Sequence, residues 1–223
     1  MTIPTLAVTL SVAAFSMPSL ALAGTLFIPE GSANSVLLVD VDTGVTIQRL
    51  PGFEAVHGLA GAVGVKYLVA GSYTEFDREE MSSTARPIDV SEDDHAAHHS
   101  KSEKASLPED LGLSLVTILD AETREIVQRI EVPGAVHHTA VSPDGRLALA
   151  THPAGGGISI IDLEKLSFRA FILTGPRPNY AEFRSESDKI YVTNTGNGPL
   201  SKVDVVKGLV TGTIKVGGGP EPL

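Results

Sequence analysis

A unit that recurs every 42 residues organises this chain, and an aspartate at the end of an apolar run marks each copy. The marker aspartates are Asp40, Asp120, Asp162 and Asp204. The last three are spaced by 42 residues, whereas Asp40 and Asp120 lie 80 apart, which is one unit plus about 38 inserted residues. A repeat of this length built from short strands is typical of propeller blades. The sequence therefore predicts an all-β fold, a β-propeller of four-stranded antiparallel blades.

The spacing of apolar runs and turns divides the unit into four strands, A to D. In the third copy these are His138–Val141, Arg146–Thr151, Gly157–Leu163 and Phe168–Leu173. The turn Ser142–Gly145 has proline second and glycine last, which favours a type I turn. The next copy repeats the pattern with 180–184, 189–194, 200–205 and 210–216. In the second copy, strands A and B are expected at 58–62 and 65–70, where the sequence Gly61-Ala-Val-Gly64 replaces the Pro-Asp-Gly turn.

The first copy begins at strand B, with Thr25–Pro29, so the chain is predicted to hold three strands and then three units of four. Propellers remove their open edges by pairing strands from the two chain ends, and that partner is missing here. We expect an incomplete propeller, the N-terminal portion of a ring of about seven or eight blades. The alternatives are a four-bladed ring and self-association of two halves through their open edges.

The first 23 residues resemble a secretory leader. Leu6–Phe15 is apolar, Pro18 interrupts the run, and Ala21–Ala23 forms a small-residue cleavage pattern before Gly24. We therefore expect residues 1–23 to be a signal peptide, residues 24–223 to be periplasmic or secreted, and no membrane span after leader removal. No lysine or arginine precedes Arg49, so the usual positive region is missing. The alternative is an apolar first strand.

Charge and cysteine content exclude several kinds of partner. The net charge of −10 argues against nucleic acid and anionic membranes, because both need a basic surface. The chain has no cysteine, which excludes disulfides, thiolate metal sites and covalent c-type haem attachment within it.

The extra residues fall between strands B and C of the second copy, at 75–110. This insertion is rich in acidic residues, serine, lysine and histidine and nearly lacks large apolar side chains. It cannot bury enough surface to fold alone, so a long disordered excursion is expected.

The segment Ile190–Asn194 contains the sequence Tyr-Val-Thr-Asn. Together with the turn Ser142–Gly145 and the segment Val216–Pro220, it resembles the YVTN family of β-propeller repeats over residues 25–74 and 111–223. Related propellers include periplasmic and surface proteins of unknown role, the d-type haem domain of cytochrome cd nitrite reductase and the copper-bearing propeller of nitrous-oxide reductase. The resemblance implies the fold and leaves the function open.

Four residues stand 17 positions after the markers: His57, His137, Asn179 and Glu221. Because strand A is innermost in a propeller, equivalent residues entering it should form a ring at one rim of the central channel, with His138 beside them. Such groups suit copper, zinc, a haem or an anionic substrate. The alternative is that they hydrogen-bond neighbouring backbone and water, as buried polar groups do.

A histidine-rich tract in the insertion is the second candidate site. It comprises Asp93, Asp94, His95, His98 and His99. Tracts of this kind bind zinc, copper or nickel loosely. The alternative is a solvated polar loop, because a closed site uses four well-placed ligands.

No catalytic motif is recognisable, and the marker aspartates are expected to accept backbone N–H bonds in their turns. Three functions follow as hypotheses. The first is an exported propeller that binds a partner protein or small ligand. The second is a redox propeller whose rim histidines hold copper or haem. The third is a periplasmic metal-handling protein that uses the histidine-rich insertion.

Overall fold

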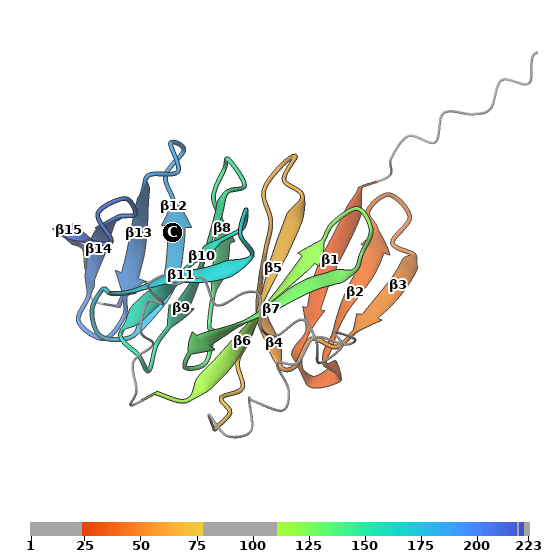
Figure 1. Cartoon of the computed structure of the whole chain (residues 1–223), viewed down its shortest axis with the longest axis horizontal. Helices are drawn as coiled ribbons and strands as arrows, with labels where there is room; N and C mark the ends of the chain where they lie inside the picture. Colours follow the sequence, from red (N-terminus) through yellow and green to blue (C-terminus); the bar gives the residue numbers. More distant parts are fainter. Residues whose placement is uncertain (1–23, 78–110, 218, 221–223) are drawn as a thin grey trace, which may run out of the picture.

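The computed structural model describes residues 24–77, 111–217, 219 and 220, and Figure 1 shows them as a row of small antiparallel sheets. The strands are β1 (Thr25–Glu30), β2 (Ser35–Asp40), β3 (Thr46–Pro51), β4 (Val56–Ala60), β5 (Tyr67–Ser72), β6 (Leu113–Asp120), β7 (Ile126–Pro133), β8 (Thr139–Val141), β9 (Leu147–His152), β10 (Gly157–Asp162), β11 (Ser167–Leu173), β12 (Pro178–Phe183), β13 (Lys189–Asn194), β14 (Pro199–Asp204) and β15 (Leu209–Lys215). A 3-10 turn, η1 (Gly31–Ala33), joins β1 to β2.

The strands form one three-stranded and three four-stranded sheets, here called blades I to IV in chain order. Within each blade, strands that follow one another in sequence pair side by side and antiparallel. The predicted count of three strands followed by three units of four is confirmed. Among the described residues blade I has no strand A, so β1 is its inner edge there.

The blades stand next to one another in sequence order, from β1–β3 on the right of Figure 1 to β12–β15 on the left. Their inner strands meet, because β4 contacts β8 and β8 contacts β12. Their outer strands also follow in order, with β7 contacting β11 and β11 contacting β15. These contacts place the described blades as consecutive blades of a propeller, which confirms the predicted fold class.

Apolar clusters between neighbouring blades form the core. Val69, Val116 and Ile161 belong to the cluster between blades II and III, and Ile160 and Val192 to that between blades III and IV. Strand β6 is buried along its whole length, because neighbours cover both faces of blade II. In contrast, β3 and β15 are largely exposed.

Strands C and D of every blade share one irregularity. The pairing register shifts near the marker aspartate, between Leu38 and Val39 in blade I and at equivalent positions in the others. A bulge at this point bends the strand and increases its twist. The repeat therefore encodes blade twist as well as strand order.

Each marker aspartate closes the turn between strands C and D. Its Oδ1 accepts the backbone N–H three residues later, at 2.8 Å from Thr43 and 2.9 Å from Thr123, Lys165 and Lys207. Hydrogen bonds from Thr43 and Thr123 hold the pKa values of Asp40 and Asp120 below their ordinary range. These contacts agree with the predicted structural role.

Strands β4 and β5 are displaced by about two residues from the predicted ranges 58–62 and 65–70. The cause is the turn that stands where blade III has the Pro-Asp-Gly sequence of residues 143–145. Val65 donates its N–H to the Ala62 carbonyl at 3.1 Å, and Gly64 takes a φ of +73°. Because this turn takes up the residues between the two strands, β4 ends two residues earlier and β5 begins two residues later than predicted.

The insertion leaves blade II after Asp77, and residues 78–110 lie outside the described residues, as does the predicted leader 1–23. Its first residues are held in place, because Phe76 pairs with Leu113 through two backbone hydrogen bonds of 2.7 and 3.0 Å. Within the described part of the chain, no helix has the length and apolar character needed to cross a membrane.

Candidate functional site

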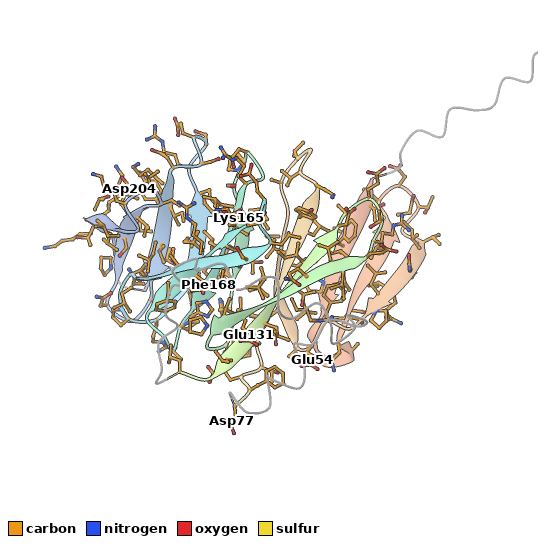
Figure 2. The ribbon with its side chains drawn as sticks, in the orientation of Figure 1. Glu54, Asp77, Glu131, Lys165, Phe168 and Asp204 are labelled. Atoms are coloured by element: carbon orange, nitrogen blue, oxygen red, sulfur yellow. The ribbon has the colours of Figure 1, made fainter. Side chains whose placement is uncertain are left out.

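The two ends of the blades carry different connections. One end, the turn face, holds the A–B turns and the C–D turns with the marker aspartates. The other end, the loop face, holds the B–C connections and the crossovers from one blade to the next. Figure 2 places Asp204 toward the upper, turn face and places Glu54 and Asp77 on the lower, loop face.

The crossovers on the loop face begin with a glycine in a left-handed or extended positive-φ conformation. Gly52, Gly134 and Gly175 have φ values of +89°, +77° and +147°. Only glycine adopts such angles without strain, and they let the chain reverse from an outer strand D toward the next inner strand A. Each crossover then delivers one predicted rim residue, His57, His137 or Asn179, to the inner edge of its blade.

The structure brings His57 and His137 together across the boundary between blades II and III. Their ring centroids are 5.0 Å apart and their planes are inclined by 69°. His57 is exposed and His137 is half-buried. Two imidazoles separated by 80 residues in sequence therefore share one small area of the rim.

Tyrosines extend this pair into a continuous row of rings. The Tyr73 centroid lies 5.1 Å from that of His57, and the Tyr180 centroid lies 5.4 Å from that of His137. His138 follows, 5.2 Å from Tyr180. We call these five residues the rim row; they come from blades II, III and IV.

The two tyrosines are the site residues that sequence reasoning missed. Tyr180 carries a usable signal, since it stands 42 residues after His138 and therefore occupies the same place in the next blade. Tyr73 carries none, because it lies just beyond β5 in a connection that differs between copies.

Asn179 acts through its backbone. Its carbonyl oxygen lies 3.2 Å from Nδ1 of His137 and accepts a 2.8 Å hydrogen bond from the Thr151 hydroxyl. Because a carbonyl only accepts, Nδ1 of His137 carries the hydrogen in this arrangement. Such a bond fixes the tautomer and orientation of an imidazole, a common arrangement for metal-binding histidines.

His138 points toward the next blade. Its Nε2 lies 3.6 Å from Oε1 of Glu182, which is longer than a hydrogen bond but close enough for an ion pair when the imidazole is protonated. The Nε2 atom is buried and has no hydrogen-bond partner among the residues that the structure describes. His138 therefore contributes a second link between blades III and IV.

His152 lies behind the row and is completely buried. Its Nδ1–H donates to the Gly134 carbonyl at 3.0 Å, and its Nε2 accepts from the Ser159 hydroxyl at 2.8 Å. Burial lowers the pKa of His152 to about 4, so the ring is neutral at physiological pH. It holds the crossover that carries His137, which is a structural role.

The other predicted site residues lie outside the described residues. These are Glu221 of the rim and Asp93, Asp94, His95, His98 and His99 of the insertion. Among the residues that the structure does describe, no group of three or more His, Cys, Asp or Glu side chains is arranged to hold a metal ion. The described part of the rim thus offers a pair of imidazoles, which is half of a four-ligand set.

Neither a protein-family model nor a curated protein sequence matches the chain. Its fold is similar to that of the solved hydrazine synthase of Kuenenia stuttgartiensis, with a TM-score of 0.62 and 16% sequence identity. The match covers 86% of this chain and 46% of the hydrazine synthase chain, so this chain spans about half of that protein. At this identity the likeness supports the propeller fold alone.

Proposed function

We propose that this chain is an exported, YVTN-type β-propeller module that binds a small ligand at its rim row, and that the ligand is a divalent transition-metal ion. The observation that carries the proposal is the meeting of His57 and His137, whose ring centroids lie 5.0 Å apart. Imidazole nitrogen is a preferred ligand of zinc and copper.

Three features support metal binding over a purely structural role for this pair. The exposed position of His57 leaves room for an ion beside the pair. The Asn179 carbonyl orients the His137 ring, as outer-shell acceptors do in metal sites. The repeat also predicts Glu221 as a further member of the ring, which would add a carboxylate ligand.

Metal analysis and zinc titration of the full chain test this proposal. We expect the wild-type protein to bind zinc and the double variant His57→Ala/His137→Ala to lose at least about 100-fold in affinity, as ligand removal does. Tyr73→Phe is the matched control, because it keeps an aromatic ring in the row and leaves both imidazoles in place. Equal zinc affinity in the double variant and the wild type would refute the rim site.

The histidine-rich insertion and a haem give different results in the same preparations. Metal held by the insertion would survive replacement of His57 and His137 and would disappear when residues 92–99 are deleted. A haem carrier would purify with a Soret absorption band that the double variant lacks. These outcomes separate metal held at the rim, metal held by the insertion and a bound haem.

A partner protein at the loop face is the second candidate function. Tyr73 favours it, because this residue is 55% exposed at the open end of the row and exposed tyrosines are common in interfaces. We expect Tyr73→Ala to weaken co-purification of an identified partner while zinc affinity stays unchanged. If Tyr73→Ala instead weakens zinc affinity and leaves co-purification of the partner unchanged, the rim row binds metal alone.

A further inference from the structure

A cavity of about 240 Å³ lies at the boundary between blades I and II. The crossover from β3 to β4 forms one side, through Gly52, Phe53 and Glu54, and blade II forms the other. Its walls combine buried apolar groups with hydroxyls and one cation; the residues from blade II are Val56, Ala70, Gly71, Ser72, Leu115, Thr117 and Arg129.

The blade repeat shows what is unusual about this cavity. Arg129 stands nine residues after the marker of blade II, and Arg49 stands nine residues after the marker of blade I. Their strand pairings are equivalent, since Arg49 pairs with Leu37 and Arg129 with Thr117, each three residues before its marker. The two guanidinium groups are therefore carried by the same position of two successive blades.

In blade I this arginine has a carboxylate partner. Nε of Arg49 lies 2.7 Å from Oε2 of Glu30, and Nη2 lies 3.0 Å from Oε1, which is a two-bonded pair. Glu30 is the last residue of strand B in its blade. Paired parallel bonds of this type are the strong, geometrically specific form of arginine recognition.

In blade II the same place at the end of strand B belongs to Ser72, which has no carboxylate. Arg129 donates one hydrogen bond from Nη2 to the Gly52 carbonyl at 3.2 Å. Within the described part of the chain, no carboxylate lies within 4.0 Å of its guanidinium. The cavity thus retains the cation of the blade I pair and lacks its anion.

The later blades fill the corresponding space with their own side chains. Strand B of blade III ends in His152, which lies against Phe171, with ring centroids 5.7 Å apart. Strand B of blade IV ends in Asn194, whose Nδ2 donates to the Ser201 hydroxyl at 2.8 Å. Among the described blades, only blade II combines a small residue here with an arginine facing open volume.

We propose that this cavity binds a small organic monocarboxylate, whose carboxylate takes the place that Glu30 occupies beside Arg49. Two oxygens would pair with Arg129, near the hydroxyls of Ser72 and Thr117. A short hydrocarbon body would contact the buried side chains of Phe53, Val56 and Leu115. Glu54 also lines the cavity and disfavours a second negative charge on the ligand.

Titration of the full chain with butyrate, followed by calorimetry or NMR, tests the proposal. Butyramide is the matched control ligand, because it keeps the shape and removes the charge. We expect saturable butyrate binding, and binding of butyramide that is weaker by about tenfold or more, since charge-assisted bonds to arginine provide the difference. Equal binding of the two ligands, or no saturable binding of butyrate, would overturn the proposal.

Three variants locate the bound anion. Arg129→Gln should weaken butyrate binding by about tenfold or more, while Arg49→Gln, at the same place in blade I, should leave it unchanged. Ser72→Glu should weaken binding to a similar extent and raise the thermal midpoint, because it restores within blade II the pair seen in blade I. If Arg129→Gln alters folding, Ser72→Glu still tests the proposal. Undiminished butyrate binding in Ser72→Glu would overturn it.

This site is independent of the proposed metal function. The double variant His57→Ala/His137→Ala should bind butyrate as the wild type does, and Ser72→Glu should bind zinc as the wild type does. Loss of both ligands in either variant would show that one rearrangement affects both places, which would contradict two separate sites.

Discussion

At the turn face each marker aspartate bonds within its own blade, whereas at the loop face the histidines of the rim row contact rings and carbonyls of neighbouring blades. Asp162 closes its turn by accepting the Lys165 N–H. His137 instead contacts His57 of blade II and the Asn179 carbonyl of blade IV. Both kinds of residue occupy fixed places in the repeat, yet only the second joins blades.

This difference separates structural from functional candidates in a repeat protein. A residue that closes a turn is needed in every copy, because every copy has the same turn to close. A residue that acts across a boundary depends on its neighbours, so its identity can change between copies, as from His137 in blade III to Asn179 in blade IV. Arg49 and Arg129 extend the contrast, because the same side chain is paired in one blade and faces a cavity in the next.

The largest effect on stability is expected from His152, which lies on the loop face yet behaves as a structural residue. His152→Ala removes two buried hydrogen bonds and leaves the Gly134 carbonyl and Ser159 hydroxyl without that partner. We expect a loss of about 3 kcal/mol in the free energy of unfolding, measured by urea denaturation. A loss below about 1 kcal/mol in the free energy of unfolding would contradict a structural role for His152.

Lowering the pH should reproduce part of this loss of stability in the wild-type protein. The folded-state pKa of His152 is about 4, below the unfolded value of 6.5, so the unfolded chain binds this proton more readily. The resulting stability is fully present above pH 6.5 and is lost as the pH falls toward 4, by about 3 kcal/mol in total.

The variant His152→Asn is the control for this pH dependence, because it copies the Asn194–Ser201 pair of blade IV. Its free energy of unfolding should change less than that of the wild type between pH 6.5 and 4. Parallel curves for the two proteins would show that another group causes the loss.

A smaller effect is expected at the turn face. Asp120→Ala removes the acceptor of the Glu122 and Thr123 N–H groups and the contact with Lys66 at 3.5 Å. We expect the thermal midpoint to fall by about 2–4 °C, as loss of a turn cap does in a domain of this size. Zinc and butyrate binding should not change, and a loss of either at unchanged fold would contradict a purely local role.

The smallest stability effect is expected at the rim row itself. His57 is exposed, so His57→Ala should change the free energy of unfolding by less than about 0.5 kcal/mol. Chemical denaturation of His57→Ala and His152→Ala in parallel measures the two changes in the free energy of unfolding. A large loss at His57 would mean that the rim histidines support the blades, as the structural alternative for this ring holds.

The repeat predicts most of the fold because its signals are local. Marker aspartates, turn glycines and short apolar runs place the strands of blades III and IV within about two residues of their observed bounds. The displacement of β4 and β5 follows from an unusual turn at Gly61–Gly64, whose geometry the sequence did not define.

The site residues that could be predicted are those at equivalent positions of the repeat. Counting from the markers brings His57 and His137 to the same place, and the structure brings them together. It does not reveal Tyr73, which lies outside the repeated strands, or the bond from His137 to the Asn179 carbonyl, which depends on the path of the crossover. The cavity beside Arg129 needed both the strand register and the volume around it.

Calorimetric zinc titration of His57→Ala, His137→Ala and the double variant tests the central claim most directly, namely that blades II and III share one ligand at the rim. If the two imidazoles hold the same ion, each single variant should lose most of the affinity and the double variant should lose little more. Undiminished zinc binding in either single variant, or losses that simply add, would contradict a shared site.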